Sequence, residues 1–272
     1  MDVLQSLIHK PVLNPVPELD RADIVSQLKA IGAQINKPMI PATISYMNHH
    51  FEKASGQNGR ALNIDATFNK ITNDHINKQV DAVVEEIPVQ PASAEIDKIR
   101  DVLGDYTTYF SPQDASRTQN VRLAANAINN YLIAPGKVFS YNKVVGERTE
   151  TAGYLPAYIF VGQEEIKGDG GGVCQDSSTL FQAVREANLK VLERHNHSLP
   201  VSYVAKGQDA TVAYGLLDFR FQNDTKGYLL VSALTGNNWL RIRLFGVADP
   251  NHPVQQADGY PVRPDVFNED FK

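Results

Sequence analysis

Apolar side chains recur at helical spacing along much of the chain. Between Ile24 and Ile35 they lie three or four positions apart, which predicts an amphipathic helix over residues 19–35 with Asp20 as its cap. The same spacing predicts four further helices, over residues 65–83, 94–103, 120–132 and 174–188.

Short runs rich in β-branched and aromatic residues predict strands. In the first 90 residues these runs are 42–47 and 84–89, and the turn residues from Gly56 to Gly59 predict a hairpin that leads into 61–65. A longer series comprises residues 106–110, 191–192, 201–204, 210–214, 217–221, 228–233 and 239–245. This order of elements predicts an α+β fold in which a central helix packs on a mostly antiparallel sheet.

Proline-containing stretches divide the chain. Residues 1–18 hold Pro11, Pro15 and Pro17 and are expected to form an extended arm. Pro91 marks a boundary, so we expect a small α+β module over 19–90 and a second domain over 94–248. Residues 249–272 are expected to be an irregular tail.

The composition narrows the class of protein. The 272 residues are 42% hydrophobic and 21% charged, which is typical of a water-soluble globular protein. A net charge of −5 gives no basic surface for nucleic acid. No run approaches the ~18 consecutive apolar residues of a membrane span, so a membrane link is expected only through a segment that this chain lacks.

One stretch suggests chemistry: three glycines, Gly170 to Gly172, precede the single cysteine, Cys174, at the predicted start of a helix. The free N–H groups and the dipole of a helix start favour a thiolate over a thiol. The glycines let a substrate backbone approach the sulfur. The alternative is that the glycines form a tight loop and that Cys174 is a small buried apolar residue.

A reactive thiolate needs a base, and two histidines follow the helix. His195 and His197 are two residues apart, so on a strand they face opposite sides and only one serves. Asp209 or Asp218 would orient the imidazole, although a turn explains Asp209 and a role as backbone acceptor explains Asp218. Gln175 is a candidate oxyanion donor together with the N–H of Cys174, or it only ties the glycine loop.

Zinc is the second chemical option. Cys174, His195, His197 and Asp209 are residue types that bind zinc, but the chain has no CxxC or HExxH motif. We therefore expect no metal and no other cofactor.

From about Lys137 to Ala233 the sequence resembles the VanW family, which is named for an accessory gene of vancomycin-resistance clusters. The motifs that carry the resemblance are Val138 to Asn142, Val145-Gly146, Gly153-Tyr154, Gly170 to Leu180, Glu193 to Ser198, Pro200 to Val204, Gly207 to Val212, and Asp218 to Phe221 with Asn223. Two positions depart from the usual pattern: Asp176, where an apolar residue is common, and Asn196, where proline is common.

Upstream, Lys37 to Ile71 resembles the peptidoglycan-binding domain that often precedes VanW, with Gly59 to Asp65 at its centre. The two resemblances imply an extracytoplasmic protein of the bacterial cell envelope, with peptidoglycan or its precursors as partner. They do not imply a reaction.

The order of cysteine, helix, histidine and aspartate is similar to the core of transglutaminase-like and papain-like cysteine enzymes. The leading hypothesis is a hydrolase or transferase acting on peptide or amide bonds of the cell wall, with Cys174 as nucleophile and His197 as base. His197 is preferred over His195 because the family pattern keeps His-Ser before the strand. The expected substrate-binding residues are Gly170, Gly171, Gly172, Ser177, Arg194 and Tyr203. The rivals are a non-catalytic peptidoglycan- or glycan-binding module and a zinc-dependent hydrolase.

Overall fold

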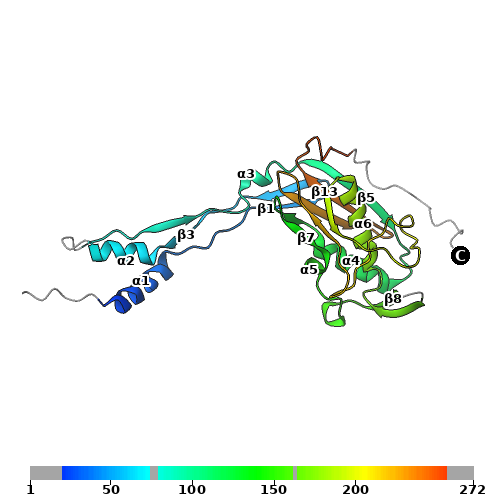
Figure 1. The fold of residues 1–272 in the computed structure, drawn as a ribbon, viewed down its shortest axis with the longest axis horizontal. Helices are drawn as coiled ribbons and strands as arrows, with labels where there is room; N and C mark the ends of the chain where they lie inside the picture. Colours follow the sequence, from blue (N-terminus) through cyan, green and yellow to red (C-terminus); the bar gives the residue numbers. More distant parts are fainter. Residues whose placement is uncertain (1–19, 74–78, 162–163, 256–272) are drawn as a thin grey trace, which may run out of the picture. The chain divides into compact units, whose positions relative to one another are not determined.

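A computed structural model describes residues 20–73, 79–161 and 164–255, so the expected N-terminal arm and most of the expected tail lie outside the described residues. The chain forms two compact units (Figure 1). The first comprises residues up to Ile40 together with Gln57–Val89, and the second comprises Pro41–Gly56 together with the residues from Gln90 onward. The two units are therefore interleaved along the sequence.

The first unit packs two helices beside a two-stranded sheet. Helix α1 (Arg21–Ile35) begins where Asp20 accepts a hydrogen bond from the N–H of Ala22 at 2.8 Å, as the pattern predicts. It contacts strand β3 (Gly59–Leu62) and helix α2 (Ile64–Asn73). Strand β3 pairs antiparallel with β4 (Val84–Ile87).

The hairpin of the N-terminal region differs from the one expected. Strand β1 (Thr43–Met47) pairs with β2 (His50–Ala54) across Asn48 and His49, whose φ angles are +47° and +67°. The hairpin predicted at residues 56–59 was wrong, because β2 pairs with β1 and β3 pairs with β4. The turn at Asn48 and His49 was missed, because a left-handed pair without glycine is a weak turn signal. Ile44 and Tyr46 of this hairpin are buried with Leu230 and Phe245, within the second unit.

Antiparallel sheets form the framework of the second unit. A four-stranded sheet has the order β5 (Asp101–Tyr109), β13 (Trp239–Gly246), β12 (Leu229–Thr235) and β6 (Tyr131–Ile133). A three-stranded sheet has the order β10 (Lys190–Glu193), β11 (Arg220–Gln222) and β7 (Val138–Ser140). Strands β8 (Pro156–Val161) and β9 (Glu164–Asp169) form a separate hairpin. Every pairing is antiparallel, which confirms the α+β expectation.

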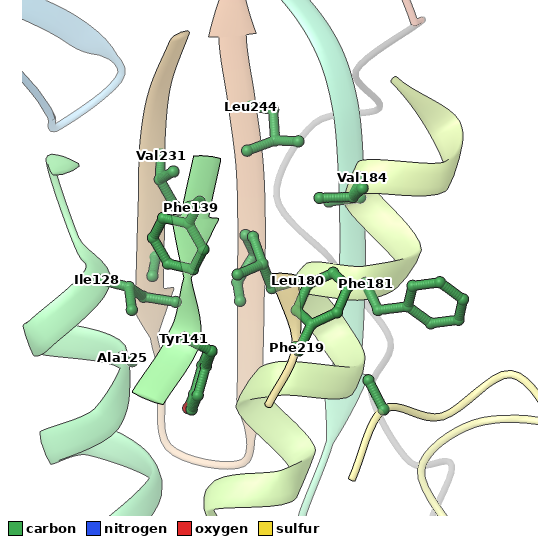
Figure 2. Packing of buried hydrophobic residues seen from close by; sticks show 14 of the residues in the cluster. Ala125, Ile128, Phe139, Tyr141, Leu180, Phe181, Val184, Phe219, Val231 and Leu244 are labelled. Carbon is green, nitrogen blue, oxygen red and sulfur yellow. The ribbon is translucent and has the colours of Figure 1, made fainter. Parts of the chain in front are cut away.

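Helix α6 (Val173–Glu186) is central in this unit. It contacts β5, β13 and helix α4 (Ala115–Ile128), and 11 of its 14 residues are buried. Figure 2 shows Leu180 of α6 beside the sheet, while Phe181 lies beside Phe219, with ring centroids 5.6 Å apart. A central helix on an antiparallel sheet is thus confirmed. The remaining helices are the short α3 (Ser93–Ile96), α5 (Tyr141–Val145) and the 3-10 turn Glu150–Ala152.

Several predicted bounds were wrong. The helix expected over 94–103 ends at Ile96, because the apolar residues that follow enter β5 and the core. The helix expected over 120–132 begins earlier, at Ala115, where the Asp114 carboxylate accepts a hydrogen bond from the N–H of Arg117 at 2.9 Å. Residues 201–204 and 210–214 form loops and one isolated bridge instead of strands. Among the described residues, no helix is both long and apolar enough to cross a bilayer.

The close approach of β5 to α6 gives a test of this packing. A Cβ atom at Gly104 would lie 2.0 Å from the carbonyl oxygen of Ala183, so we expect Gly104→Ala to lower the unfolding free energy of the second unit by about 1 to 3 kcal/mol. The fluorescence of Trp239, the single tryptophan, follows urea unfolding of this unit. Gly227→Ala is the control, because its Cβ would have ordinary contacts; we expect a change within about 0.5 kcal/mol. Equal effects of the two substitutions would contradict this packing.

Candidate functional site

The glycine loop fixes where Cys174 lies. Gly170 and Gly172 have φ angles of +77° and +106°, which side chains rarely adopt, so the loop can turn sharply into α6. Gly172 is the N-cap of α6, and Cys174 is therefore the second residue of the helix. A Cβ atom at Gly171 would lie 2.6 Å from the carbonyl oxygen of Tyr158, so the loop also packs tightly on β8. Cys174 lies in the first turn of a helix, as its sequence predicts.

The sulfur of Cys174 lies at the surface of a pocket. Its side chain is partly buried, and Sγ donates to the carbonyl oxygen of Val212 at 3.5 Å. The N–H groups of Val173 and Gln175 donate to Gly170 and Gly172, whereas the N–H of Cys174 has no backbone acceptor among the described residues. One donor beside the sulfur is therefore available to a ligand.

His197 is hydrogen-bonded to Asp209 and lines the same pocket as Cys174. Nδ1 of the imidazole lies 2.5 Å from Oδ2 of Asp209, and the same oxygen accepts the backbone N–H of His197 at 2.6 Å. Burial of the ring favours a lower pKa for His197, but its hydrogen bonds and charge interactions with Cys174 and Asp209 outweigh burial and raise it. Because Nδ1 faces Asp209, Nε2 is the nitrogen left for the sulfur.

Asp209 is held in place by the chain around it. Only 4% of its surface is exposed, and Nε of Arg194 donates to its carbonyl oxygen at 2.6 Å. Arg194 also donates to the carbonyl oxygen of Gly207 at 2.6 Å and lies 3.6 Å from Oδ1 of Asp209. Although burial raises the pKa of Asp209, hydrogen bonds from His197 outweigh it and lower the pKa. Arg194 thus holds the carboxylate, and its guanidinium is already used by the protein.

Other expected site residues lie elsewhere. Nε2 of His195 is 3.2 Å from Oε1 of Glu193, and His195 does not line the pocket. Asp218 accepts hydrogen bonds from Ser140 Oγ at 2.5 Å and from the N–H of Asn142 at 2.8 Å. The structure therefore brings together Cys174, His197 and Asp209, and it separates His195 and Asp218 from them.

The side chains of Gln175 and Ser177 form hydrogen bonds inside the protein. Nε2 of Gln175 donates to Thr108 Oγ1 at 2.9 Å and to the carbonyl oxygen of Tyr109 at 3.0 Å, which uses both of its N–H groups. Ser177 is fully buried and donates to the carbonyl oxygen of Ala210 at 2.6 Å. Neither side chain has a donor left for a ligand.

A pocket of about 730 Å³ opens beside the sulfur. Its lining includes Cys174, His197 and, among the expected substrate-binding residues, Gly170, Gly172 and Tyr203. Burial and the charge of Cys174 raise the pKa of Tyr203, so its hydroxyl stays protonated. Arg117 and Arg148 also line the pocket, and the sequence did not predict this. Nothing in the local sequence pattern shows that α4 or the loop after α5 lies near Cys174.

Asp176, the unusual residue next to Gln175, is fully buried, and neither carboxylate oxygen has a hydrogen-bond partner. Burial raises its pKa well above the usual range, against the opposing charge of Arg117. Burial therefore favours the neutral form of this carboxyl.

Within the described residues, no group of three His, Cys, Asp or Glu side chains is arranged to hold a metal ion. The Asp209 carboxylate contacts Nδ1 of the His197 imidazole. These two groups therefore bind each other, and they do not point at a common position where a metal ion could lie.

Comparisons with known proteins find matches to two family models. Residues 116–245 match the model of the family "VanW like protein", and residues 1–87 match "Putative peptidoglycan binding domain". The two matches lie in the expected order along the chain and confirm both resemblances. No solved structure gave a significant match.

Two curated relatives are similar to the chain. "Uncharacterized protein YoaR" of Bacillus subtilis is 48% identical over 161 residues, which cover 59% of this chain and 53% of that protein. "Vancomycin B-type resistance protein VanW" of Enterococcus faecalis is 32% identical over 111 residues, which cover 39% of this chain and 40% of that protein. The chain thus spans about half the length of the curated relatives it matches, or less.

The contact between His197 and Asp209 predicts that removal of the Asp209 charge changes the pKa of His197. In Asp209→Asn the carboxylate charge that raises the pKa of His197 is gone, so we expect that pKa to fall. The imidazole C–H signals in an NMR titration measure it, and a spectrum of His197→Ala assigns them. Asp224→Asn, which removes a carboxylate beside His252, is the control and leaves the pKa of His197 unchanged. An unchanged pKa in Asp209→Asn would contradict the described pairing.

Proposed function

We propose that this chain is a cell-envelope protein whose VanW-like domain is a cysteine-dependent hydrolase or transferase acting on peptide or amide bonds of peptidoglycan or its precursors. Cys174 is the nucleophile, His197 the base and acid, and Asp209 the residue that orients the imidazole. The observation that carries this proposal is the His197–Asp209 pair, with Nδ1 2.5 Å from Oδ2, in the pocket that Cys174 also lines.

The arrangement supports acyl transfer in two steps. His197 takes the proton of the Cys174 thiol, and the sulfur attacks the carbonyl carbon of the substrate. The C–N bond then breaks, and the leaving amine takes a proton from the imidazolium, which leaves a thioester on Cys174. Water or a second amine attacks the thioester while His197 accepts its proton, and Cys174 is released with a new carboxylic acid or amide.

Two donors support the developing oxyanion. The N–H of Cys174 lacks a backbone acceptor, and it lies at the N-terminus of α6, where the helix dipole favours negative charge. The protonated Tyr203 hydroxyl, which lies close enough to Cys174 for their charges to interact, is the second candidate. Gln175 does not take this role, because both of its N–H groups are used elsewhere.

The proposed location and partner follow from the family matches. A peptidoglycan-binding domain before a VanW-like domain supports a cell-wall-associated protein, and one relative is named for resistance to vancomycin. We extend this to an extracytoplasmic location and to peptidoglycan as the substrate.

A binding role without catalysis is the second candidate. The pocket lining includes Tyr158 and Tyr214, which are 54% and 52% exposed, and exposed aromatic faces suit the apolar faces of sugar rings. In this role the pocket would hold glycan or a peptide stem, and Cys174 would be dispensable. The zinc-dependent alternative lacks a ligand cluster among the described residues.

Peptidoglycan digestion distinguishes catalysis from binding. Purified muropeptides incubated with the protein, with and without a free amino acid as acceptor, are expected to give hydrolysed or exchanged products by mass spectrometry. Cys174→Ala should abolish the products, and His197→Ala should lower their rate by about 10²- to 10⁴-fold.

His195→Ala is the matched control, because this imidazole lies outside the pocket. It should leave the rate nearly unchanged. Products that form equally well with Cys174→Ala would contradict the nucleophile, and retained peptidoglycan binding without any product would favour the binding role.

A further inference from the structure

Arg117 lines the pocket that Cys174 also lines. It comes from α4, and its Nη2 donates to Oε1 of Gln175 at 2.6 Å, while its guanidinium lies 6.0 Å from the centre of the Tyr203 ring. That is the single hydrogen bond of its guanidinium within the described residues, and the side chain is partly buried. Arg117 thus has donors left for a ligand in the pocket.

Arg148 brings a second positive charge to the same pocket. Nη1 donates to Oδ1 of Asn142 at 2.7 Å, and the guanidinium lies 6.0 Å from the centre of the Tyr214 ring. Nη2 is buried without a hydrogen-bond partner. A buried donor without a partner is costly, so a nearby anion would stabilise this group.

Neither guanidinium is neutralised by contact. Six other arginines form ion pairs with carboxylates, but Arg117 and Arg148 form none with the described residues. The Asp114 carboxylate caps α4, and Glu147 and Asp169 are exposed at the edge of the pocket, where solvent screens them. Burial raises the pKa of Asp176 well above its usual range, against the opposing charges of Arg117 and Arg148, and its carboxyl forms no ion pair with either guanidinium among the described residues.

We propose that the pocket contains a carboxylate subsite, formed by Arg117 and supported by Arg148, so that the acyl donor is a peptide with a free carboxylate near the bond that Cys174 attacks. This inference rests on the proposed function, because it names the substrate class of the same site. A guanidinium with free N–H groups in a fixed position suits a carboxylate, and charge-assisted hydrogen bonds give such contacts their strength.

Two alkylating reagents of similar size test the subsite without the natural substrate. Iodoacetate carries a carboxylate and iodoacetamide is neutral; both alkylate the single cysteine by displacement of iodide. The measured quantity is the ratio of their rate constants on Cys174, divided by the same ratio on N-acetylcysteine. We expect this normalised ratio to exceed one by about tenfold, and to fall toward one in Arg117→Gln and, to a smaller extent, in Arg148→Gln.

Arg117→Lys keeps the charge and is expected to retain part of the preference. Arg122→Gln, an exposed arginine on the same helix, is the matched control and should leave the ratio unchanged. The iodoacetamide rate of each variant shows whether the site is still folded. A wild-type ratio near one, or a high ratio that survives Arg117→Gln, would overturn the subsite.

Protection from iodoacetamide identifies the anion. An N-acetylated dipeptide with a free C-terminal carboxylate should slow alkylation at lower concentration than its C-terminal amide or inorganic phosphate does. Stronger protection by phosphate would overturn the choice of carboxylate. A Cys174 that reacts no faster than N-acetylcysteine, yet shows the iodoacetate preference, would refute the proposed catalysis and leave the subsite standing.

Discussion

Helix α6 packs so closely on β5 that the carbonyl oxygen of Ala183 leaves no room for a side chain at Gly104. The helix is buried along most of its length, and polar residues within it, such as Gln175 and Ser177, are hydrogen-bonded to neighbouring elements. Such a helix cannot tilt without breaking buried contacts. The position of Cys174 in its first turn is therefore set by the core of the second unit.

His197 and Asp209 are held in place by hydrogen bonds from side chains, and not by pairing within a sheet. His197 and Asp209 both lie in loops, and the two backbone segments are joined by the Asp209 carboxylate and by Arg194, which donates to two carbonyl oxygens. The oppositely shifted pKa values of His197 and Asp209 have this one contact as a shared cause. The pocket is thus lined by Cys174 from the buried helix α6 and by His197 from a loop that hydrogen bonds hold in place.

The sequence predicted those features that depend on local pattern. The start of α6, the central helix on antiparallel strands and the motifs of the VanW-like domain were all predictable from spacing and residue type. The loops at 201–204 and 210–214 were predicted as strands, because their residues favour β-structure while tertiary hydrogen bonds decide their course. Arg117 and Arg148 were not predictable, since only the packing of α4 and of the loop after α5 brings them to the pocket. The hydrogen bonds from the Gln175 amide to Thr108 and Tyr109 were not predictable either, because these residues belong to a strand that is distant in sequence.

The rate at which iodoacetamide alkylates Cys174 near pH 6 tests the central claim, that His197 activates this sulfur, most directly. If His197 activates the sulfur, Cys174 reacts at least about tenfold faster than N-acetylcysteine at that pH, and His197→Ala removes most of the advantage whereas His195→Ala does not. A rate equal to that of N-acetylcysteine, or one that His197→Ala leaves unchanged, would contradict it.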